Sequence, residues 1–203
     1  MKTKLLVAFS ALTLAPLARA ADTPAACACC AAPQISTAPV TDRSLFQLDA
    51  TWTTDAGQPI QLASFRGRPV VLTMFFASCT YACPIIVGDL QRIRAALPAD
   101  ARAKTQFVLV SFDSARDTPT ALRAYRTRAN LDGTGWTLLH GAPADVQELA
   151  MLLGVKYKQD ASGQFSHSNL ITVLNAEGEI VHQRPGLQGE IADAVHAITV
   201  AAK

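Results

Sequence analysis

The sequence predicts an α/β fold in which a mixed central sheet is covered by helices on both faces. Two apolar runs, 69–76 (PVVLTMFF) and 106–112 (QFVLVSF), have the length and composition of strands that are buried on both faces. A segment with helical spacing follows each run, and a hairpin pattern lies nearer the C-terminus. Strand–helix alternation followed by a hairpin favours a mixed sheet of this kind.

The composition indicates one globular domain. The chain has 203 residues, of which 50% are hydrophobic and 17% are charged, and this excludes a disordered chain, a coiled coil and a collagen-like repeat. The formal net charge is only +2, and no block of Lys or Arg indicates a nucleic-acid surface. We therefore expect no nucleic-acid partner.

Regular structure is expected from Leu45 onward. Residues 50–54 and 60–62 flank a turn and predict a hairpin or a strand with a turn. The run 69–76 predicts the first buried strand, and apolar residues at helical spacing over 84–97 predict the helix that follows it.

The alternation then repeats toward the C-terminus. We expect a strand at 106–112, a helix at 118–128 with Pro119 in its first turn, a short strand at 136–139 and a helix at 144–153. Strands at 170–175 and 179–184 flank a three-residue turn in which Gly178 suits a left-handed conformation, and a helix at 189–200 closes the chain. This order is typical of the thioredoxin-like fold.

The N-terminal residues have the pattern of a secretory signal peptide. A basic start and the apolar run 5–17 precede Ala18-Arg19-Ala20, which fits the small-x-small motif of signal peptidase. The run is shorter than the ~20 residues that a membrane span needs. We therefore predict that residues 1–20 are cleaved, that 21–42 form a flexible tether, and that 43–203 form one domain. The mature chain is expected in the periplasm, with no stable membrane span.

The chain has five cysteines, and export places them in an oxidising compartment, where thiols pair unless a metal or a redox cycle uses them. Cys27, Cys29 and Cys30 lie in the predicted tether. Three thiols this close can bind a soft cation such as Cu(I) as an accessory site. The alternative is that they are exposed thiols that form a strained or intermolecular disulfide.

Cys79 and Cys83 stand between the first buried strand and the first long helix, and Pro84 follows them. Backbone N–H groups and the helix dipole at such a position stabilise a thiolate and lower its pKa. If the loop is helical, the four-residue offset places both sulfurs on one face. A C-x-x-x-C motif is also compatible with a structural disulfide or unrelated thiols, but this location favours a working dithiol.

Three residues between the cysteines permit the wider sulfur separation that a metal needs, without forbidding a disulfide. Soft thiolates select Cu(I), Zn or iron–sulfur clusters, and two sulfurs leave the coordination incomplete, so a third ligand is expected from elsewhere. His167 is the best-placed candidate because it immediately precedes the strand at 170–175. Two thiolates and an imidazole suit copper as Cu(I) or Cu(II). The other three histidines are expected to be partly exposed or in the core: His140, His182 and His196.

At these residues the sequence resembles the Sco/SenC family of copper chaperones for cytochrome c oxidase assembly. The similarity covers most of 45–203 and includes 65–68 (FRGR), the Cys79–Pro84 motif, 111–119 (SFDSARDTP) and His167-Ser168. The resemblance implies a thioredoxin-like fold and copper held by Cys79, Cys83 and His167.

The chain departs from the family pattern at several places. Ser166 stands where many members have aspartate, many members are membrane-anchored, and the tether cysteines are not part of the core pattern. In the 111–119 segment we expect Asp113, Arg116 and Asp117 to cap the following helix and to form a local ion pair.

Two functions of different classes follow. The first is a periplasmic copper metallochaperone that delivers copper to the copper-site subunit of a cytochrome oxidase or to another periplasmic copper protein. The second is a thiol–disulfide reductase, with Cys79 and Cys83 as its redox-active dithiol, that keeps the acceptor cysteines reduced. Both need a thiol–disulfide reductant as a partner. A thiol peroxidase is less well supported, since the sequence offers no residue set for a peroxide pocket.

Overall fold

The computed structural model describes residues 40–131, 133–161 and 163–203. The predicted signal peptide and most of the predicted tether, including Cys27, Cys29 and Cys30, lie outside the described residues. Within the described part of the chain, no helix has both the length and the apolar character needed to cross a membrane.

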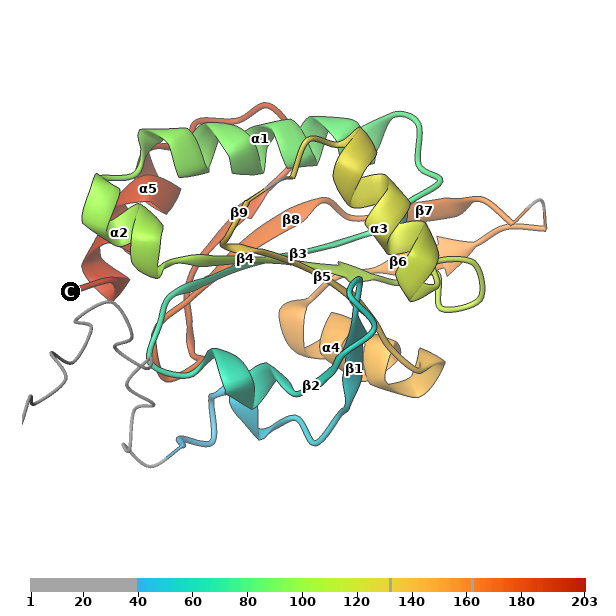
Figure 1. The fold of residues 1–203 in the computed structure, drawn as a ribbon, viewed down its shortest axis with the longest axis horizontal. Coiled ribbons are helices and arrows are strands. Elements are labelled where there is room, and N and C mark those ends of the chain that lie inside the picture. Colours follow the sequence, from blue (N-terminus) through green and yellow to red (C-terminus); the bar gives the residue numbers. More distant parts are fainter. Residues whose placement is uncertain (1–39, 132, 162) are drawn as a thin grey trace, which may run out of the picture. The chain divides into compact units, whose positions relative to one another are not determined.

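The central sheet has seven strands in the order β2–β1–β5–β4–β3–β8–β9 (Figure 1). The three inner strands β3, β4 and β5 are parallel, whereas β8 and β9 on one side and β1 and β2 on the other are antiparallel to their neighbours. The sheet is therefore mixed, as predicted. The strands span Trp52–Thr54 (β1), Pro59–Ile60 (β2), Val70–Phe75 (β3), Gln106–Ser111 (β4), Trp136–His140 (β5), Leu170–Leu174 (β8) and Ile180–Pro185 (β9).

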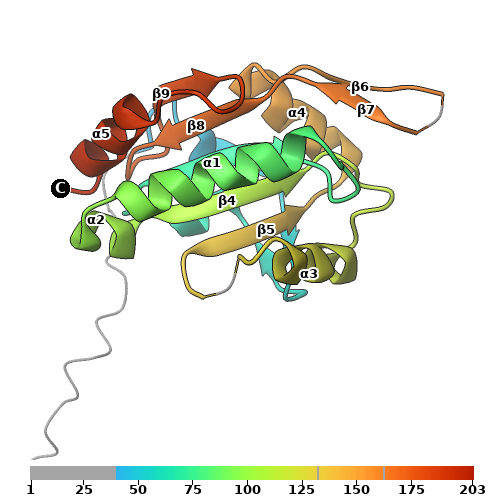
Figure 2. The same ribbon diagram turned by 90° about the horizontal axis from the view of Figure 1, so that it is seen from above.

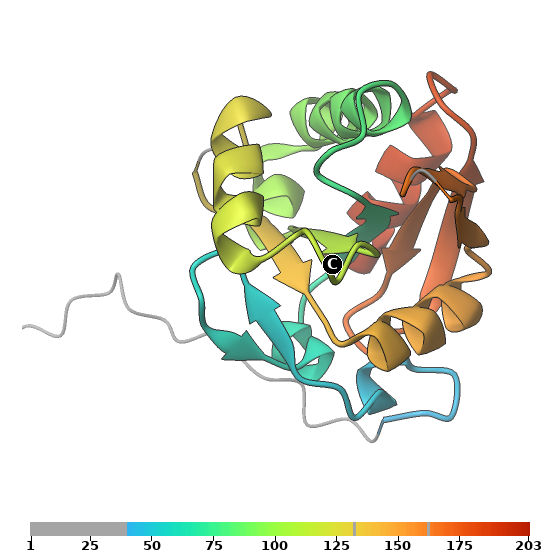
Figure 3. The same cartoon turned by 90° about the vertical axis from the view of Figure 1, so that its right-hand side faces the viewer.

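Helices cover both faces of this sheet. Figure 3 shows α1 and α3 on one side and α4 on the other, and the view from above in Figure 2 shows α5 near the C-terminal end of α1. All six residues of β3 and all but the first of β4 are buried, because each face of these strands is covered. The helices span Ala82–Ala96 (α1), Ala99–Lys104 (α2), Pro119–Arg128 (α3), Pro143–Leu153 (α4) and Ala192–Ala201 (α5).

The predicted turn before β9 is confirmed. Gly178 has a φ of +86°, a left-handed conformation that favours glycine. A Cβ atom at this position would lie 2.5 Å from the ring of Phe46, so the close approach of the N-terminal segment also requires glycine.

Several elements were not predicted. Two single-turn 3-10 helices, Leu45–Gln47 and Leu62–Phe65, and the short α2 carry too few residues to show a period. No strand was predicted immediately before 170–175, but Phe165–His167 form β7, which pairs with β6 (Tyr157–Gln159) in a separate two-stranded sheet. This hairpin projects beyond the first turn of α1 (Figure 2).

The topology brings distant segments to one edge of the sheet. The carboxyl ends of β3, β4 and β5 meet there because these strands are parallel. Strand β8 is antiparallel to β3, so its first residues arrive at the same edge. The Thr73 hydroxyl, buried within β3, donates to the Leu170 carbonyl at 2.8 Å and ties the start of β8 to this edge. Residues that follow β3 and residues that precede β8 are thus neighbours.

Candidate metal centre

The two cysteines lie where β3 passes into α1. Cys79 is in the connecting loop and is partly exposed, whereas Cys83 is the second residue of α1 and is fully buried. The loop is not helical at Cys79, so the sulfurs do not meet through a shared helical face. Instead, the Cys83 backbone N–H donates to Cys79 Sγ at 3.3 Å, and this bond holds the first sulfur over the start of the helix.

Side chains from α3 and its preceding loop fix the backbone just before Cys79. The Asp117 carboxylate accepts from the Ala77 N–H at 2.7 Å and from the Ser111 hydroxyl at 2.5 Å. Arg128 donates to the Ala77 carbonyl at 3.0 Å. Both backbone groups of Ala77 are therefore held by side chains, one from the buried Asp117 and one from the exposed Arg128, and these bonds fix the backbone that leads to Cys79.

Asp117 does not have the predicted role. The N-cap of α3 is Thr118, whose hydroxyl accepts from the Ala121 N–H at 3.3 Å, and the buried Asp117 side chain turns to Ala77 instead. Burial raises the pKa of Asp117, and the hydrogen bonds from Ser111 and Ala77 only partly oppose this. A sequence motif cannot distinguish a capping aspartate from one that reaches a neighbouring loop.

The expected ion pair between Asp113 and Arg116 is present, and it has a wider role than predicted. Arg116 also donates to the Gly163 carbonyl at 2.6 Å and lies 5.8 Å from the ring centre of Phe165. Both contacts reach the β6–β7 hairpin. The loop after β4 thereby anchors the segment that carries His167.

His167 occupies the end of β7 and faces the cysteines. Its Nε2 atom is 4.0 Å from Cys83 Sγ, and its Nδ1 atom is 3.2 Å from the Ser168 carbonyl. Since a carbonyl only accepts, Nδ1 carries the proton and Nε2 presents its lone pair toward the sulfurs. Burial lowers the pKa of His167, with the Ser168 bond opposing, so the imidazole is neutral at pH 7.

An aromatic cluster, absent from the predicted site, supports His167. Its ring lies 4.9 Å from Phe112 and 5.9 Å from Phe76, measured between ring centres. Phe112 also stacks on Tyr157 at 5.1 Å and contacts Phe165 at 5.1 Å. The available sequence signal was that Phe76 and Phe112 each immediately follow a buried strand, which places both rings at the same edge of the sheet.

Burial raises the pKa of the Cys83 thiol, with smaller opposing and reinforcing contributions from Phe76 and Cys79. This is opposite to the lowered pKa that the helix start predicted, because Cys83 lies inside the core rather than at the exposed helix end. A bare thiolate is therefore costly here. A cation held by Cys83 would supply the missing compensation, since a coordinating thiol is deprotonated.

Cys79, Cys83 and His167 come together as one cluster, with all three ligand atoms within 4.8 Å of one another. A first-row metal bound about 2.0–2.3 Å from sulfur and nitrogen holds its ligands about 3.5–4 Å apart, so the donor set fits a metal after small adjustments. Among the described residues this is the only such group. The other histidines lie outside it: His140 bonds the Asp117 carbonyl, His182 lies in β9, and His196 is exposed on α5.

Comparisons with known proteins agree with this architecture. The SCO1/SenC family model matches residues 40–202. A Stutzerimonas stutzeri protein named for copper binding is 29% identical over 143 residues, which cover 68% of each chain.

Two solved structures share the fold. A SCO1/SenC family lipoprotein from Bacillus anthracis has a TM-score of 0.69 and 20% identity, covering 75% of this chain and 92% of its own. Arabidopsis thaliana ScoI with copper bound has a TM-score of 0.64 and 17% identity, covering 75% of this chain and 94% of its own. The observed sheet order and these neighbours confirm the thioredoxin-like fold. Because the family match extends over most of the sequence, the chain belongs to the SCO1/SenC family.

Proposed function

We propose that this protein binds copper through Cys79, Cys83 and His167 and delivers it to the copper centre of a cytochrome oxidase. The observation that carries the proposal is the convergence of two thiols and one neutral imidazole within 4.8 Å, from segments 84 residues apart. Copper binding by related chains, named in the S. stutzeri protein and the Arabidopsis structure, supports the choice of metal.

The ligand set suits both oxidation states of copper. Thiolates are soft ligands that favour Cu(I), whereas the imidazole nitrogen also suits Cu(II). Only the reduced dithiol can take up Cu(I), because a Cys79–Cys83 disulfide removes both sulfur ligands. The thiol redox state therefore controls loading. Delivery proceeds by ligand exchange, in which thiolates or imidazoles of the acceptor replace the three ligands in turn.

The proposal places the protein in the periplasm. The signal-peptide pattern of residues 1–20 supports export, and oxidase copper centres are the acceptors that family membership suggests. N-terminal sequencing of the exported protein tests this placement. A chain that begins at Ala21 supports it, and a chain that still begins at Met1 contradicts it.

The second function, a thiol–disulfide reductase, rests on the contact between the two cysteines. The Cys83 N–H bond to Cys79 Sγ places a partly exposed sulfur beside a buried one, an arrangement in which the first attacks and the second resolves. This activity needs the sulfurs and the helix start but not the imidazole.

His167→Ala separates the two functions. A copper site loses one of its three ligands, so we expect Cu(II) affinity to fall at least about tenfold, while thiol–disulfide exchange stays within about twofold. His196→Ala, an exposed histidine on α5, is the matched control. Cu(II) titration and exchange rates are measured on all three proteins. Unchanged Cu(II) affinity in His167→Ala contradicts the three-ligand site and favours the reductase.

Cys27, Cys29 and Cys30 are proposed as an accessory Cu(I) site. Replacing all three with serine lowers the Cu(I) stoichiometry of the reduced protein and leaves the spectrum of the main site unchanged. An unchanged stoichiometry shows that these thiols do not hold copper.

A further inference from the structure

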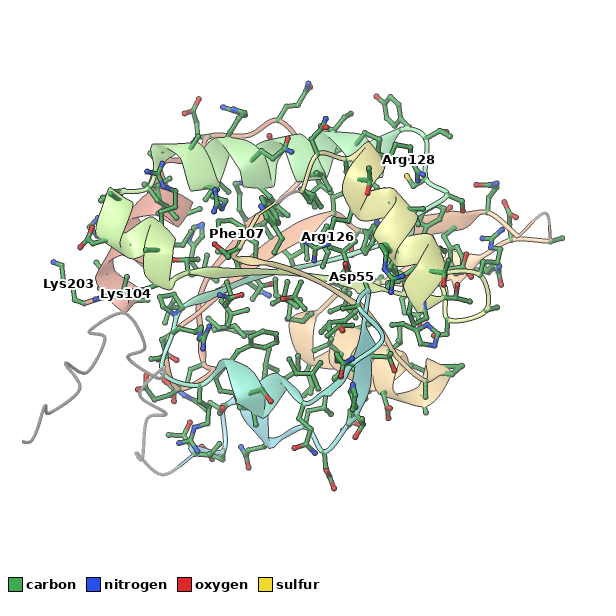
Figure 4. All side chains as sticks on the ribbon, viewed as in Figure 1. Asp55, Lys104, Phe107, Arg126, Arg128 and Lys203 are labelled. Atoms are coloured by element: carbon green, nitrogen blue, oxygen red, sulfur yellow. The ribbon has the colours of Figure 1, made fainter. Side chains whose placement is uncertain are left out.

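A hollow of about 590 Å³ opens beside Cys79, on the side away from His167's hairpin, and lies between α1 and α3. Cys79 lines it, together with Pro84 and Val87 of α1 and Tyr125 and Arg128 of α3, whereas Cys83 does not. Figure 4 shows Arg128 at the end of α3 that lies nearest α1. The hollow therefore leaves the partly exposed Cys79 accessible from this side.

A second hollow of about 270 Å³ continues the first along α1. The two share Gln91 and Asn130 in their walls, and the second is also lined by Arg94, Arg102 and Trp136. On this shared wall Gln91 bridges α1 and the end of α3 by donating to the Ala129 carbonyl at 3.0 Å, so a ligand that spans both hollows passes over the Gln91 side chain. Together they form a groove, the α1 groove, that begins at Cys79 and ends near α2.

The charge of the α1 groove has one sign. Arg94, Arg102 and Arg128 line it, and among the residues that the structure describes no aspartate or glutamate does. Within the described part of the chain, none of the three pairs with a carboxylate, although five other arginines do. Arg94 and Arg128 donate only to backbone carbonyls. Arginines without acidic partners in a groove favour a negatively charged ligand.

The length of the groove indicates a chain rather than a small molecule. At about 1.5 Å per residue, α1 rises about 18 Å between its first turn and Arg94. An extended peptide advances about 3.3 Å per residue, so about five or six residues cover this distance. A thiol compound of tripeptide size fills only the first hollow and leaves Arg94 and Arg102 unused.

We propose that the α1 groove docks an extended acidic segment of the partner protein and brings a partner sulfur to Cys79. The inference rests on the proposed function, because it names the kind of partner that exchanges ligands at this site. It also orders the exchange, since the docked segment reaches Cys79 and not the buried Cys83.

The test measures attack by Cys79 on synthetic peptides long enough to span both hollows. Each peptide has a central cysteine activated as a mixed disulfide with an aromatic thiol, flanked by glutamates in one peptide and lysines in the other. The Cys79 thiolate bonds to the peptide sulfur, the peptide–aromatic S–S bond breaks, and the aromatic thiolate leaves and is recorded. The full chain carries Cys27, Cys29 and Cys30 as serines, so that these thiols do not react.

We expect the glutamate peptide to react faster at low ionic strength, with each exposed charge pair contributing about twofold to fivefold and with the gain shrinking as salt is added. Arg128→Glu and Arg102→Glu should each reduce the preference. Arg102→Glu is the decisive variant, because the Arg102 side chain makes no hydrogen bond among the described residues and belongs to α2, far from the Cys79 loop. Arg123→Glu, on α3 but outside the groove, is the matched control and should keep the preference.

Three results overturn the inference: no preference in the parent, a preference lost equally in Arg123→Glu, or one that only Arg128→Glu removes, which restricts the site to a small ligand in the first hollow. Copper titration of the parent separates this test from the proposed function. Copper binding without a peptide preference rejects the groove alone, and a preference without copper binding rejects the chaperone alone.

Discussion

The two halves of the candidate metal centre are built differently. The cysteine half lies on the end of β3 and the start of α1, where Asp117 and Arg128 hold the Ala77 backbone. The histidine half lies on the β6–β7 hairpin, outside the seven-stranded sheet, and is held mainly by aromatic rings and by Arg116. The cysteine loop is thus fixed by hydrogen bonds to Asp117 and Arg128, which we call the framework. The imidazole instead depends on the packing of aromatic rings on the β6–β7 hairpin, which we call the rim. Changes to the framework should affect both ligand types, and changes to the rim should affect only the imidazole.

The ion pair between Asp55 and Arg126 lies away from both halves and serves as a reference. Its removal should give the largest loss in the free energy of unfolding. Arg126 of α3 makes two hydrogen bonds to the Asp55 carboxylate, at 2.6 and 3.0 Å. Burial raises the pKa of Asp55, but the hydrogen bonds and charge of Arg126, together with the backbone N–H groups of Leu138 and Asp55, outweigh burial and lower it. Arg126→Leu leaves this carboxylate without its partner and should lower the free energy of unfolding by about 3 kcal/mol at pH 7, with copper affinity unchanged.

The stability difference between the parent and Arg126→Leu should depend on pH, because the pKa of Asp55 is lowered in the folded protein. A lowered pKa contributes stability above the ordinary value of 3.8 and loses it as pH falls through the lowered pKa. The difference between parent and Arg126→Leu should therefore be largest near neutral pH and should shrink in acid. Urea unfolding across the pH range checks this, and a constant difference contradicts the role of the ion pair.

In the cysteine half, Asp117→Ala removes the acceptor for Ala77 and Ser111. We expect a loss of about 2–3 kcal/mol in the free energy of unfolding, because two buried donors lose their partner. Cu(I) and Cu(II) affinity should both decrease, since the loop before Cys79 is released. Asp117→Asn keeps an oxygen for Ala77 and should retain most of the stability. If Asp117→Ala binds both ions as the parent does, the framework does not position the sulfurs.

In the histidine half, Tyr157→Ala removes the ring that stacks on Phe112, at the position that pairs with His167 across the β6–β7 hairpin. We expect about 1 kcal/mol of destabilisation and a several-fold loss of Cu(II) affinity, with thiol–disulfide exchange unchanged. Tyr81→Ala, which removes a 76% exposed ring near the cysteines, is the control. Equal loss of Cu(I) and Cu(II) binding in Tyr157→Ala means that the two halves are not independent.

The smallest effect is expected at Ser166. Side chains alternate along a strand, so Ser166 points away from the face that His167 presents, and it is exposed. Ser166→Asp, which restores the residue common in the family, should change copper affinity less than about twofold. A larger gain, measured by titration, means that a carboxylate at this position reaches the metal.

The sequence alone predicted the sheet, the long helices and the cysteine half. Apolar runs such as 69–76 identify buried strands directly, and the position of Cys79 and Cys83 follows from the strand before them and the helix after them. The histidine half was harder to predict. The polar strand Tyr157–Gln159 has no apolar period, and its partner β7 is only three residues long, so neither segment indicates a hairpin.

Two electrostatic details also escaped prediction, for a common reason. Asp117 bonds Ala77, which is 40 residues away in the chain, and the Cys83 thiol is buried by residues of several elements. A prediction from the position of a residue at the start of a helix considers only its neighbours along the chain, whereas burial is a property of the folded core. Such predictions therefore gave the wrong direction for the pKa of Cys83 and the wrong partner for Asp117.

The ends of the strand order have a consequence for self-association. Strands β2 and β9 form the two open edges of the sheet, where unpaired backbone groups invite another molecule to add a strand. Pro59 is one of only two residues in β2, and Pro185 ends β9, so each edge includes a residue that has no N–H to donate. Each proline therefore hinders the addition of another strand at its own position on the edge, so a partner molecule meets less resistance at the surface that carries the reactive sulfur than at these ends of the sheet.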